Sequence, residues 1–505
     1  MNKDLELHDI QGLILSGYGE KPAARYAIFE IVDGKAARRW LGRLVKSLQF
    51  ATYRGSRRHA PPFLGDLCSN VAFTYDGFRA LGLNDTALSG FALPFQEGMN
   101  EPSRARRLGD DGASAPERWQ WGKPGQAVHG VLSVFAGKGD AVPQDWVRIA
   151  EFISAQMCQD HGVVAVKVLD TLQSNSELRK EHFGFRDGIA NPRIGGLPRD
   201  RSDDILPAGE FLLGQPNVYD KLPMSPEVPA NSDPQGRLKP VSERPERRDF
   251  GRNGSYLVFR QLMQDVQGFW RYVEQARQTV PDAPPGRAGR EWLAAKFVGR
   301  WPNGTPLSLY PDAPGPEVDD QADAFSYALN EDSFGERCPI GSHIRRTNPR
   351  DTALPVPHDP ESSGDPRDKD VRTERLELTN HHRILRRGRA YGPPVDESYD
   401  TDALLREGAA EERGLHFLCF NANLSRQFEF VQSNWAQNPA FAGLSSDPDP
   451  LLGAGREVPF RASDFTIQGC PVRRVQNLPR VVETRGGAYF FMPSRSALEY
   501  LACIC

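Results

Sequence analysis

Apolar positions along the chain fall into short continuous runs and into runs that repeat at helical spacing. The segment 26–32 is apolar and β-branched and is ended by Asp33 and Gly34, after which apolar residues recur every three or four positions over 36–48. Such a run predicts a buried strand, and the spacing that follows it predicts an amphipathic helix. A second strand–helix unit of the same form is expected at 255–273.

The two strand–helix units share an aromatic spacing. Phe29 and Trp40 are eleven residues apart, and so are Phe259 and Trp270. Equal spacing of large aromatic side chains in two similar units favours an internal duplication. Phe and Trp also occupy unrelated cores, so the spacing alone leaves coincidence open.

The rest of the chain continues to alternate between strand and helix patterns. Further strands are expected at 71–75, 131–135, 163–169, 416–420 and 488–492, and helices at 76–81, 144–157, 424–434 and 495–501. This alternation points to an α+β or α/β fold. Polar, proline-rich stretches predict loops at 222–249, at 281–288 with 311–320, and at 352–372, and the first of them separates two halves.

Composition narrows the class of partner. The 505 residues suffice for two or three domains of about 100–200 residues. With 62 Lys+Arg against 66 Asp+Glu the net charge is −4, which argues against a nucleic-acid partner. No apolar run approaches the roughly 18 residues that cross a bilayer. The N-terminus has no secretory pattern and the seven cysteines are scattered, so we expect reduced thiols, a cytoplasmic location and no membrane partner.

Familiar catalytic motifs are absent from the sequence: it has no Walker A, H-E-x-x-H, C-x-x-C or G-x-S-x-G pattern. Three dense polar segments remain. The first, 182–193, carries Asp187 between Gly184 and Gly188 in a loop beyond a predicted strand. A carboxylate so placed can enter a pocket, and the alternative is a turn whose aspartate caps backbone amides.

The second segment, 338–350, holds His343 close to Arg345, Arg346 and Arg350. Such a cationic cluster could neutralise an anionic ligand, for example a cofactor that carries carboxylates. It would also keep the imidazole neutral, with a nitrogen free to bind metal. The alternative is a structural or surface histidine.

The third segment, 381–392, is basic and contains Arg386 directly after the apolar pair Ile384-Leu385. Arg386 could therefore point into a polar pocket. The alternative is a basic strand and turn on the surface.

Together these segments resemble the dye-decolorizing peroxidases, a haem peroxidase family. The resemblance runs from about residue 9 to residue 501 and is carried, in family order, by 9–15, 71–82, 95–99, 183–189, 211–217, 298–302, 338–350, 383–392 and 486–493. It implies an α+β fold of two duplicated, ferredoxin-like halves, each a four-stranded antiparallel sheet with helices. We expect an N-terminal domain at 1–221 with the Asp187 loop and a haem-binding C-terminal domain at 250–505.

The resemblance also implies the chemistry. The chain would bind haem b (iron protoporphyrin IX), with His343 as the proximal iron ligand through Nε2. Asp187 would move the proton of H2O2 from one oxygen to the other. Arg386 would hold the peroxide and stabilise its developing charge. Dyes, phenols and other one-electron donors would then reduce a ferryl intermediate.

Further pocket residues follow from the same resemblance. Leu415 and Phe417 are expected at the distal haem surface, with plain core packing as the alternative. Arg345 is expected to pair with a haem propionate, or else to form a surface ion pair. Tyr391 and Trp435 are candidates for relaying electrons from bulky donors, unless they are core aromatics.

One position departs from the family pattern. After the strand at 416–420, family members often carry an acid that accepts the N–H of the proximal histidine, and Asn423 occupies the place we assign to it. A neutral amide would make the imidazole a weaker electron donor, and the alternative is that another residue accepts this N–H.

Two other readings of the family resemblance stay open. One is a haem-binding or haem-handling protein with incidental peroxidase activity, and the other is a cargo enzyme of a protein shell, although the C-terminus shows no targeting extension. Asp187 and Arg386 favour the enzyme, because haem storage or transport needs no peroxide-cleaving pair. The oligomeric state stays open, a homo-oligomer included.

Overall fold

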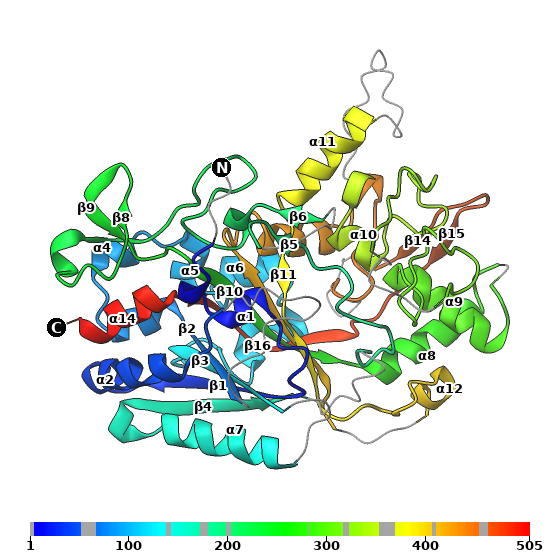
Figure 1. Ribbon diagram of the computed structural model, residues 1–505. Helices are drawn as coiled ribbons and strands as arrows, with labels where there is room; N and C mark the ends of the chain where they lie inside the picture. Colours follow the sequence, from blue (N-terminus) through cyan, green and yellow to red (C-terminus); the bar gives the residue numbers. More distant parts are fainter. Residues whose placement is uncertain are drawn as a thin grey trace.

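The computed structural model describes residues 5–51, 67–137, 143–171, 180–197, 204–281, 283–316, 323–352, 369–406, 411–453 and 463–504. In these ranges one large antiparallel sheet forms the centre of the molecule, in the order β11-β13-β10-β16-β2-β3-β1-β4, with β12 also paired to β13 (Figure 1). Its strands are β1 (Ala23–Ile31), β2 (Leu67–Phe73), β3 (Gly130–Ala136), β4 (Val163–Asp170), β10 (Ser255–Gln264), β11 (Leu385–Arg386), β12 (Arg389–Tyr391), β13 (Gly414–Asn421) and β16 (Val482–Met492).

The sheet is built from two halves that meet edge to edge. Strands β4, β1, β3 and β2 come from the N-terminal half, and β11 with β12, β13, β10 and β16 come from the C-terminal half. The join is the pairing of β16 with β2 at Phe491 and Phe73. The predicted α+β fold of two ferredoxin-like halves is confirmed.

Helices cover the two halves differently. The longer ones are α2 (Gly34–Leu44), α7 (Pro143–Gln156), α8 (Val266–Arg277), α9 (Gly286–Val298), α11 (Lys369–Asn380) and α14 (Arg495–Cys503). The shorter ones are α1 (Gly12–Leu15), α3 (Tyr75–Ala80), α4 (Asp85–Leu88), α5 (Leu93–Glu97), α6 (Pro102–Leu108), α10 (His343–Thr347), α12 (Thr401–Leu404) and α13 (Phe428–Phe430). In Figure 1, α2, α7 and α14 lie with the N-terminal half, and α8, α9 and α10 extend the opposite side of the molecule.

The two predicted strand–helix units exist and begin alike. Asp33 ends β1, and its carboxylate accepts the N–H groups of Lys35 and Ala36 at the start of α2. Asp265 ends β10 and accepts the N–H of Gly268 at the start of α8. Such an N-cap typically stabilises a helix by about 1 kcal/mol.

The aromatic pairs at eleven-residue spacing are not equivalent in three dimensions. Phe29 and Trp40 share one core, with ring centroids 5.7 Å apart. Phe259 lies in the core on the other face of the sheet, and Trp270 packs in a third core around α8 and α9. The duplication therefore concerns backbone topology, while the side chains of the two units pack differently.

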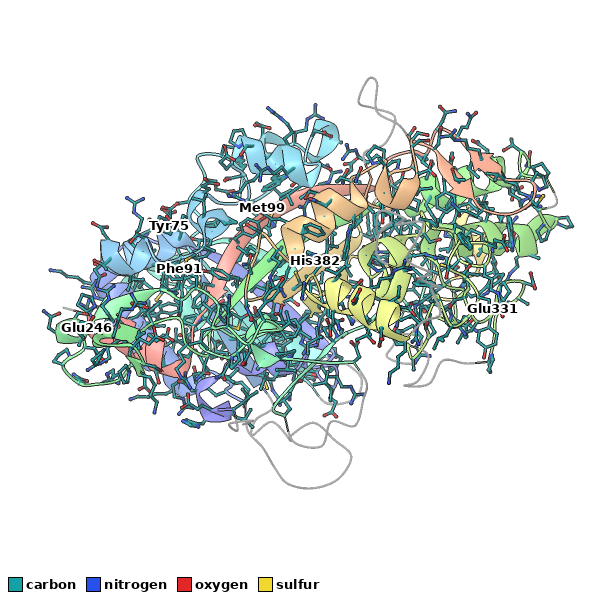
Figure 2. All side chains as sticks on the ribbon, turned by 90° about the horizontal axis from the view of Figure 1, so that it is seen from above. Tyr75, Phe91, Met99, Glu246, Glu331 and His382 are labelled. Carbon is teal, nitrogen blue, oxygen red and sulfur yellow. The ribbon has the colours of Figure 1, made fainter. Side chains whose placement is uncertain are left out.

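An aromatic cluster fastens the N-terminal helices to the sheet where the halves meet. The ring of Phe91 lies 5.3 Å from Phe78, 5.3 Å from Phe491 and 6.4 Å from Tyr256, measured between centroids. Figure 2 shows Phe91 with Tyr75 and Met99 beside these helices. This packing joins chain segments from both halves, so the halves share one core.

Two sequence predictions need correction. The predicted loop 222–249 contains a three-stranded sheet of β7 (Glu227–Pro229), β8 (Pro240–Val241) and β9 (Arg244–Asp249). The helix predicted over 424–434 begins later, with α13 and the π-helix Val431–Ala436. Gln427 has non-helical φ and ψ angles of −103° and −90°, because its buried amide binds the backbone of Glu210 and Arg383.

The remaining strands are short pairs: β5 (Arg193–Ile194) with β6 (Ile205–Leu206), and β14 (Phe465–Ile467) with β15 (Arg473–Val475). Of the predicted loops, 317–320 and 353–368 lie outside the described residues. Within the described ranges, no helix has both the length and the apolar character needed to span a bilayer.

Candidate active site

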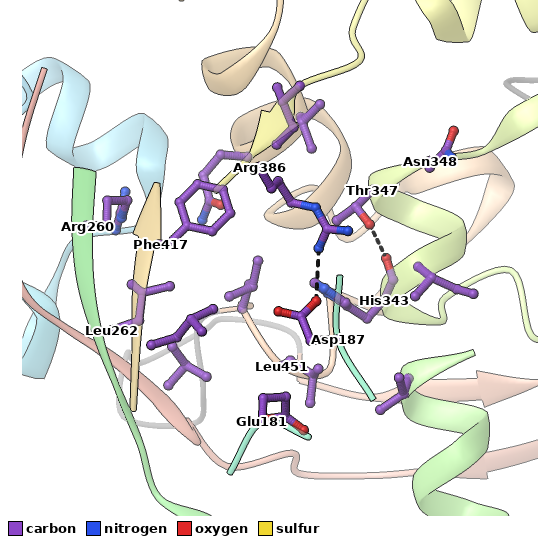
Figure 3. A pocket seen from close by; sticks show the side chains of 18 of the residues that line it. Glu181, Asp187, Arg260, Leu262, His343, Thr347, Asn348, Arg386, Phe417 and Leu451 are labelled. Atoms are coloured by element: carbon purple, nitrogen blue, oxygen red, sulfur yellow. Dashed lines mark hydrogen bonds and ion pairs between the residues drawn. The ribbon is translucent and has the colours of Figure 1, made fainter. Parts of the chain in front are cut away.

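A large cavity lies in the C-terminal half, between the sheet and the helix that carries His343 (Figure 3). Its walls come from the loop 181–190, from β10 and β13, from α10 and β11, and from the segments 428–437, 451–452 and 480–484. Asp187, His343 and Arg386 all line it. The three polar segments singled out in the sequence therefore meet at one place.

Asp187 reaches the cavity because two glycines bend the backbone on either side of it. Gly184 has a φ of +94° and Gly188 a φ of +81°, in the left-handed region that side chains disfavour. The N–H of Gly188 donates to Asp187 Oδ1 over 2.6 Å. The Asp187 side chain is 42% exposed, and it lines the cavity. The sequence alternative was an aspartate that caps backbone amides. Asp187 does bind the N–H of Gly188 in this way, but it also lines the cavity.

Arg386 lies on β11 and faces Asp187. Its Nη1 is 3.4 Å from Asp187 Oδ1, and its Nη2 donates to the carbonyl oxygen of Ala190 over 3.0 Å. The backbone N–H of Arg386 donates to Asn191 Oδ1 over 3.0 Å. Strand β11 and the Asp187 loop are thus fastened together, so the carboxylate and the guanidinium are held as a pair in the cavity.

His343 is the first residue of α10, and the position of this helix is fixed on two sides. Gly299, with a φ of +95°, ends α9 and lies so close to Ile344 that a Cβ atom would be 2.4 Å from Ile344 Cγ1. Arg346 is buried and donates to the carbonyl oxygens of Trp435 and Asn438 over 2.6 and 3.0 Å. Helix α10 therefore presents His343 from a rigid support.

The imidazole of His343 is oriented by a buried carboxylate. Its Nδ1 is 2.9 Å from Asp449 Oδ2, and the Asp449 side chain is 0% exposed. Asp449 Oδ1 accepts the N–H groups of Leu451 and Leu452, both over 2.9 Å. Burial alone would raise the pKa of Asp449, but the contact with His343, the N–H of Leu452 and the charge of Arg346 lower it. Asp449 thus orients the imidazole through Nδ1, which leaves Nε2 as the ring nitrogen that can meet a ligand in the cavity.

This contact corrects the prediction for Asn423. Asn423 Oδ1 accepts the N–H of Arg426 and caps a local turn, whereas the partner of His343 is Asp449. The acceptor is therefore an anion, which strengthens the imidazole as an electron donor and reverses the expectation of weaker donation.

Replacing Asp449 by asparagine should weaken haem retention and the reaction with peroxide by about 10–100-fold. The amide keeps the shape of the side chain but removes the charge that orients and polarises His343. Haem titration and stopped-flow absorbance measure the two quantities. Asp447→Asn is the matched control, because Asp447 is also buried and accepts the N–H of Thr466 instead of binding His343. Equal losses in both variants would mean that only packing is affected.

Arg345 does not lie where the sequence predicted it. Its guanidinium is 3% exposed and donates to Asp332 Oδ2 over 3.1 Å and to the carbonyl oxygen of Cys338 over 2.7 Å. Arg345 is absent from the cavity wall. Residues two apart on a helix do not share a face, so Arg345 points away from the side that presents His343. Its side chain is not available to a propionate in the cavity.

The apolar wall matches the sequence prediction in position. Leu415 and Phe417 of β13 line the cavity, together with Leu262 of the neighbouring strand β10. Tyr391 is 7% exposed and Trp435 is 3% exposed, so both are buried and neither offers a surface to a bulky donor.

The cavity suits the cofactor that the sequence implies. The imidazole of His343 and an apolar wall line the same cavity, which fits an iron-bearing planar macrocycle. Arg300 and Arg350 also line this cavity, with their guanidiniums bound to Asp323, and their positive charge fits the carboxylate groups of such a cofactor. The donor set therefore fits haem, with Arg350 rather than Arg345 on the cationic wall.

Comparison with known proteins gives a consistent picture. A family model described as the DyP dimeric alpha+beta barrel domain matches residues 9–166. A dye-decolorizing peroxidase of Mycetinis scorodonius is 28% identical over 98% of this chain and 87% of its own length. A multifunctional dye peroxidase of an Amycolatopsis species is 32% identical over 64% of this chain and 61% of its own length. The solved structure of an ancestral D-type dye decolorizing peroxidase superposes with a TM-score of 0.72 at 27% identity, covering 98% of this chain and 99% of that one.

Proposed function

Because the chain belongs to the dye-decolorizing peroxidases, a family of haem enzymes, we propose that it binds haem b through His343 and uses H2O2 to oxidise small one-electron donors. Dyes and phenols are the donors we propose. The observation that carries this proposal is one cavity that holds His343 with its buried Asp449 and, beside it, the Asp187–Arg386 pair.

In this proposal Asp187 transfers the proton and Arg386 stabilises the developing charge. When bound, haem supplies the redox centre at which peroxide is reduced and from which donors are oxidised. Asp187 takes a proton from one oxygen of H2O2 at its carboxylate and returns it to the other oxygen, which leaves as water. Arg386 stays charged throughout and stabilises the negative charge on the peroxide while its O–O bond lengthens.

The walls of the cavity support the same reaction. Leu262, Leu415 and Phe417 exclude water from the site and so strengthen the interaction of Arg386 with a bound anion. Helix α10 and Asp449 hold the imidazole of His343 in place, so that Nε2 is the nitrogen that would bind the haem iron. We propose domain bounds of 1–221 and 250–505, with the small sheet β7–β9 between them.

A haem-handling protein is the second candidate function. It would need His343, the apolar wall and the cationic wall, but it would have no use for a carboxylate and a guanidinium held together inside the cavity. The Asp187–Arg386 pair therefore favours a peroxidase over a carrier.

The test is the absorption spectrum of the haem-loaded protein before and after one equivalent of H2O2 at mildly acidic pH. A peroxidase should show a spectral change within the mixing time that a phenol or dye then reverses with repeated turnover. Slow bleaching without turnover would favour the haem-handling function. Failure to bind haem in a 1:1 ratio would contradict both functions.

A further inference from the structure

A second carboxylate, that of Glu181, lies in the wall of the same cavity. Glu181 stands six residues before Asp187, at the start of the turn that the backbone pairing of Lys180 with Arg186 closes. Both side chains line the cavity, and Figure 3 shows Glu181 on the wall below Asp187. The proton-transfer chemistry proposed above leaves Glu181 without a role.

The carboxylate of Glu181 holds the backbone of this turn from inside. Oε2 accepts the N–H of Phe183 over 2.9 Å, and Oε1 accepts the N–H of Phe185 over 2.9 Å. Gln264 of β10 donates from Nε2 to Oε2 over 2.7 Å. One carboxylate thus joins the turn that leads to Asp187 to the central sheet, and each of its oxygens is used.

One side of this turn is already fixed by aromatic packing. Phe183 packs on Phe269 with ring centroids 4.7 Å apart, and Phe185 stacks on Trp270. The indole N–H of Trp270 donates to the carbonyl oxygen of Phe183 over 3.2 Å. With the aromatic side anchored on α8, the position of Asp187 depends on the polar side, where Glu181 binds the backbone.

Glu181 also changes its charge within the working pH range of an enzyme. Burial raises the pKa of Glu181 to about 7, against the opposing effect of the N–H groups of Phe183 and Phe185 and of Gln264; the charge of Asp187 raises it further. The other titratable groups that interact with Glu181 are Lys180 and Tyr399, while Gln264 on β10 is uncharged.

We propose that Glu181 is a positioning residue for Asp187, because its carboxylate fixes the turn that leads to Asp187 against β10. The proposal rests on the function proposed for Asp187. Ionised Glu181 makes both oxygens strong acceptors for the backbone N–H groups of the turn, and protonation of Glu181 weakens these hydrogen bonds.

The first test is the rate of the reaction of the haem-loaded protein with H2O2 as a function of pH. The wild type should show a step with a midpoint near pH 7, where Glu181 ionises. E181Q should lack this step and should react about tenfold more slowly at pH 8, because it loses a charged hydrogen-bond acceptor.

The second variant is Q264M, which removes one donor to Glu181 and keeps the carboxylate. The hydrogen bond from Gln264 lowers the pKa of Glu181, so its loss should move the midpoint of the step to higher pH. If Glu181 only supported the fold, the loss of the hydrogen bond from Gln264 would not shift the pH midpoint of the rate. An unchanged midpoint in Q264M, with Q264M folded, would show that the step does not come from Glu181 and would overturn the proposal even if E181Q failed to fold.

A third readout does not depend on turnover. Because the pKa of Glu181 is raised from 4.5 to about 7 in the folded protein, protonated Glu181 stabilises the fold below pH 4.5, and this contribution is lost as the pH rises to about 7. The Tm of the haem-loaded wild type, relative to E181Q, should therefore fall across this window. A constant difference in Tm would contradict an ionisation of Glu181 near pH 7.

Two control variants separate the possible failures. Glu210 is a buried glutamate that accepts the N–H of Val218 outside the cavity, so E210Q should keep the step near pH 7. D187N tests the proposed function itself. A normal rate in D187N would remove Asp187 from the mechanism and this proposal with it. A slow D187N beside an E181Q with the wild-type rate and pH profile would overturn the role of Glu181 alone.

Discussion

The Asp187→Asn variant should react with H2O2 about 10²–10⁴-fold more slowly than the wild type, the range that positioned acid–base groups contribute. Asparagine has nearly the same shape, and its Oδ1 can still accept the N–H of Gly188. It cannot take a proton from peroxide at neutral pH, so only the proton transfer is removed. Stopped-flow absorbance after mixing the haem-loaded variant with excess H2O2 measures the rate constant.

The control for this variant is Asp76→Asn on helix α3. Asp76 is 66% exposed and pairs with Arg79 on the surface, so its loss should leave the rate unchanged. The haem spectrum of D187N before peroxide is added should match that of the wild type, because Asp187 does not hold the imidazole. A rate within threefold of the wild type would assign the proton transfer to another group, and Glu181 would be the next candidate.

Local backbone chemistry made the Asp187 loop predictable. A glycine three residues before the aspartate and another directly after it indicate two backbone turns, and both glycines do adopt positive φ angles. The same holds for the strand–helix units, where an aspartate after a β-branched run ends β1 and caps α2. Such features depend on neighbours within a few residues, so the sequence displays them directly.

Contacts between distant segments were not predictable in this way. Asp449 is 106 residues from His343, in a proline-rich stretch with two aspartates, and nothing in its spacing marks it as the partner of an imidazole. Asn423 was assigned instead because it follows the correct strand. Its short side chain binds the adjacent turn, and the segment 447–452 supplies the acceptor from elsewhere.

The error at Arg345 has a different cause, since the information was present in the sequence. Residues 343 and 345 are two apart, and on a helix this places them on different faces. Thr347 is four positions from His343 on the same short helix and does line the cavity with it. Helical spacing therefore argued against Arg345. The arginine that reaches the cavity wall is Arg350, which lies beyond the end of α10.

Removal of the guanidinium should be nearly as damaging as loss of Asp187. The Arg386→Met variant should react with H2O2 about 10²–10³-fold more slowly, the usual loss when one preorganised donor to a developing charge is removed. Arg386→Lys should recover part of this rate, because lysine keeps the positive charge but lacks the second N–H that Arg386 donates to Ala190. The measurement is the same stopped-flow rate, with the Tm of each variant recorded beside it.

The neighbouring Arg383 provides the control, since it separates position from charge. Arg383 also lines the cavity and is buried, but its guanidinium is paired with Asp204, with Nη2 and Oδ2 2.7 Å apart. If any cation near the cavity sufficed, R383M and R386M would lose similar rates. If the position beside Asp187 is what matters, R386M alone should be slow while R383M keeps most of the rate. R386M could also lose its rate because it unfolds, which a collapsed Tm would reveal. In that case R386K decides. If R386K has a normal Tm and recovers no rate, charge near Asp187 is insufficient and the planar, two-donor geometry of arginine is required.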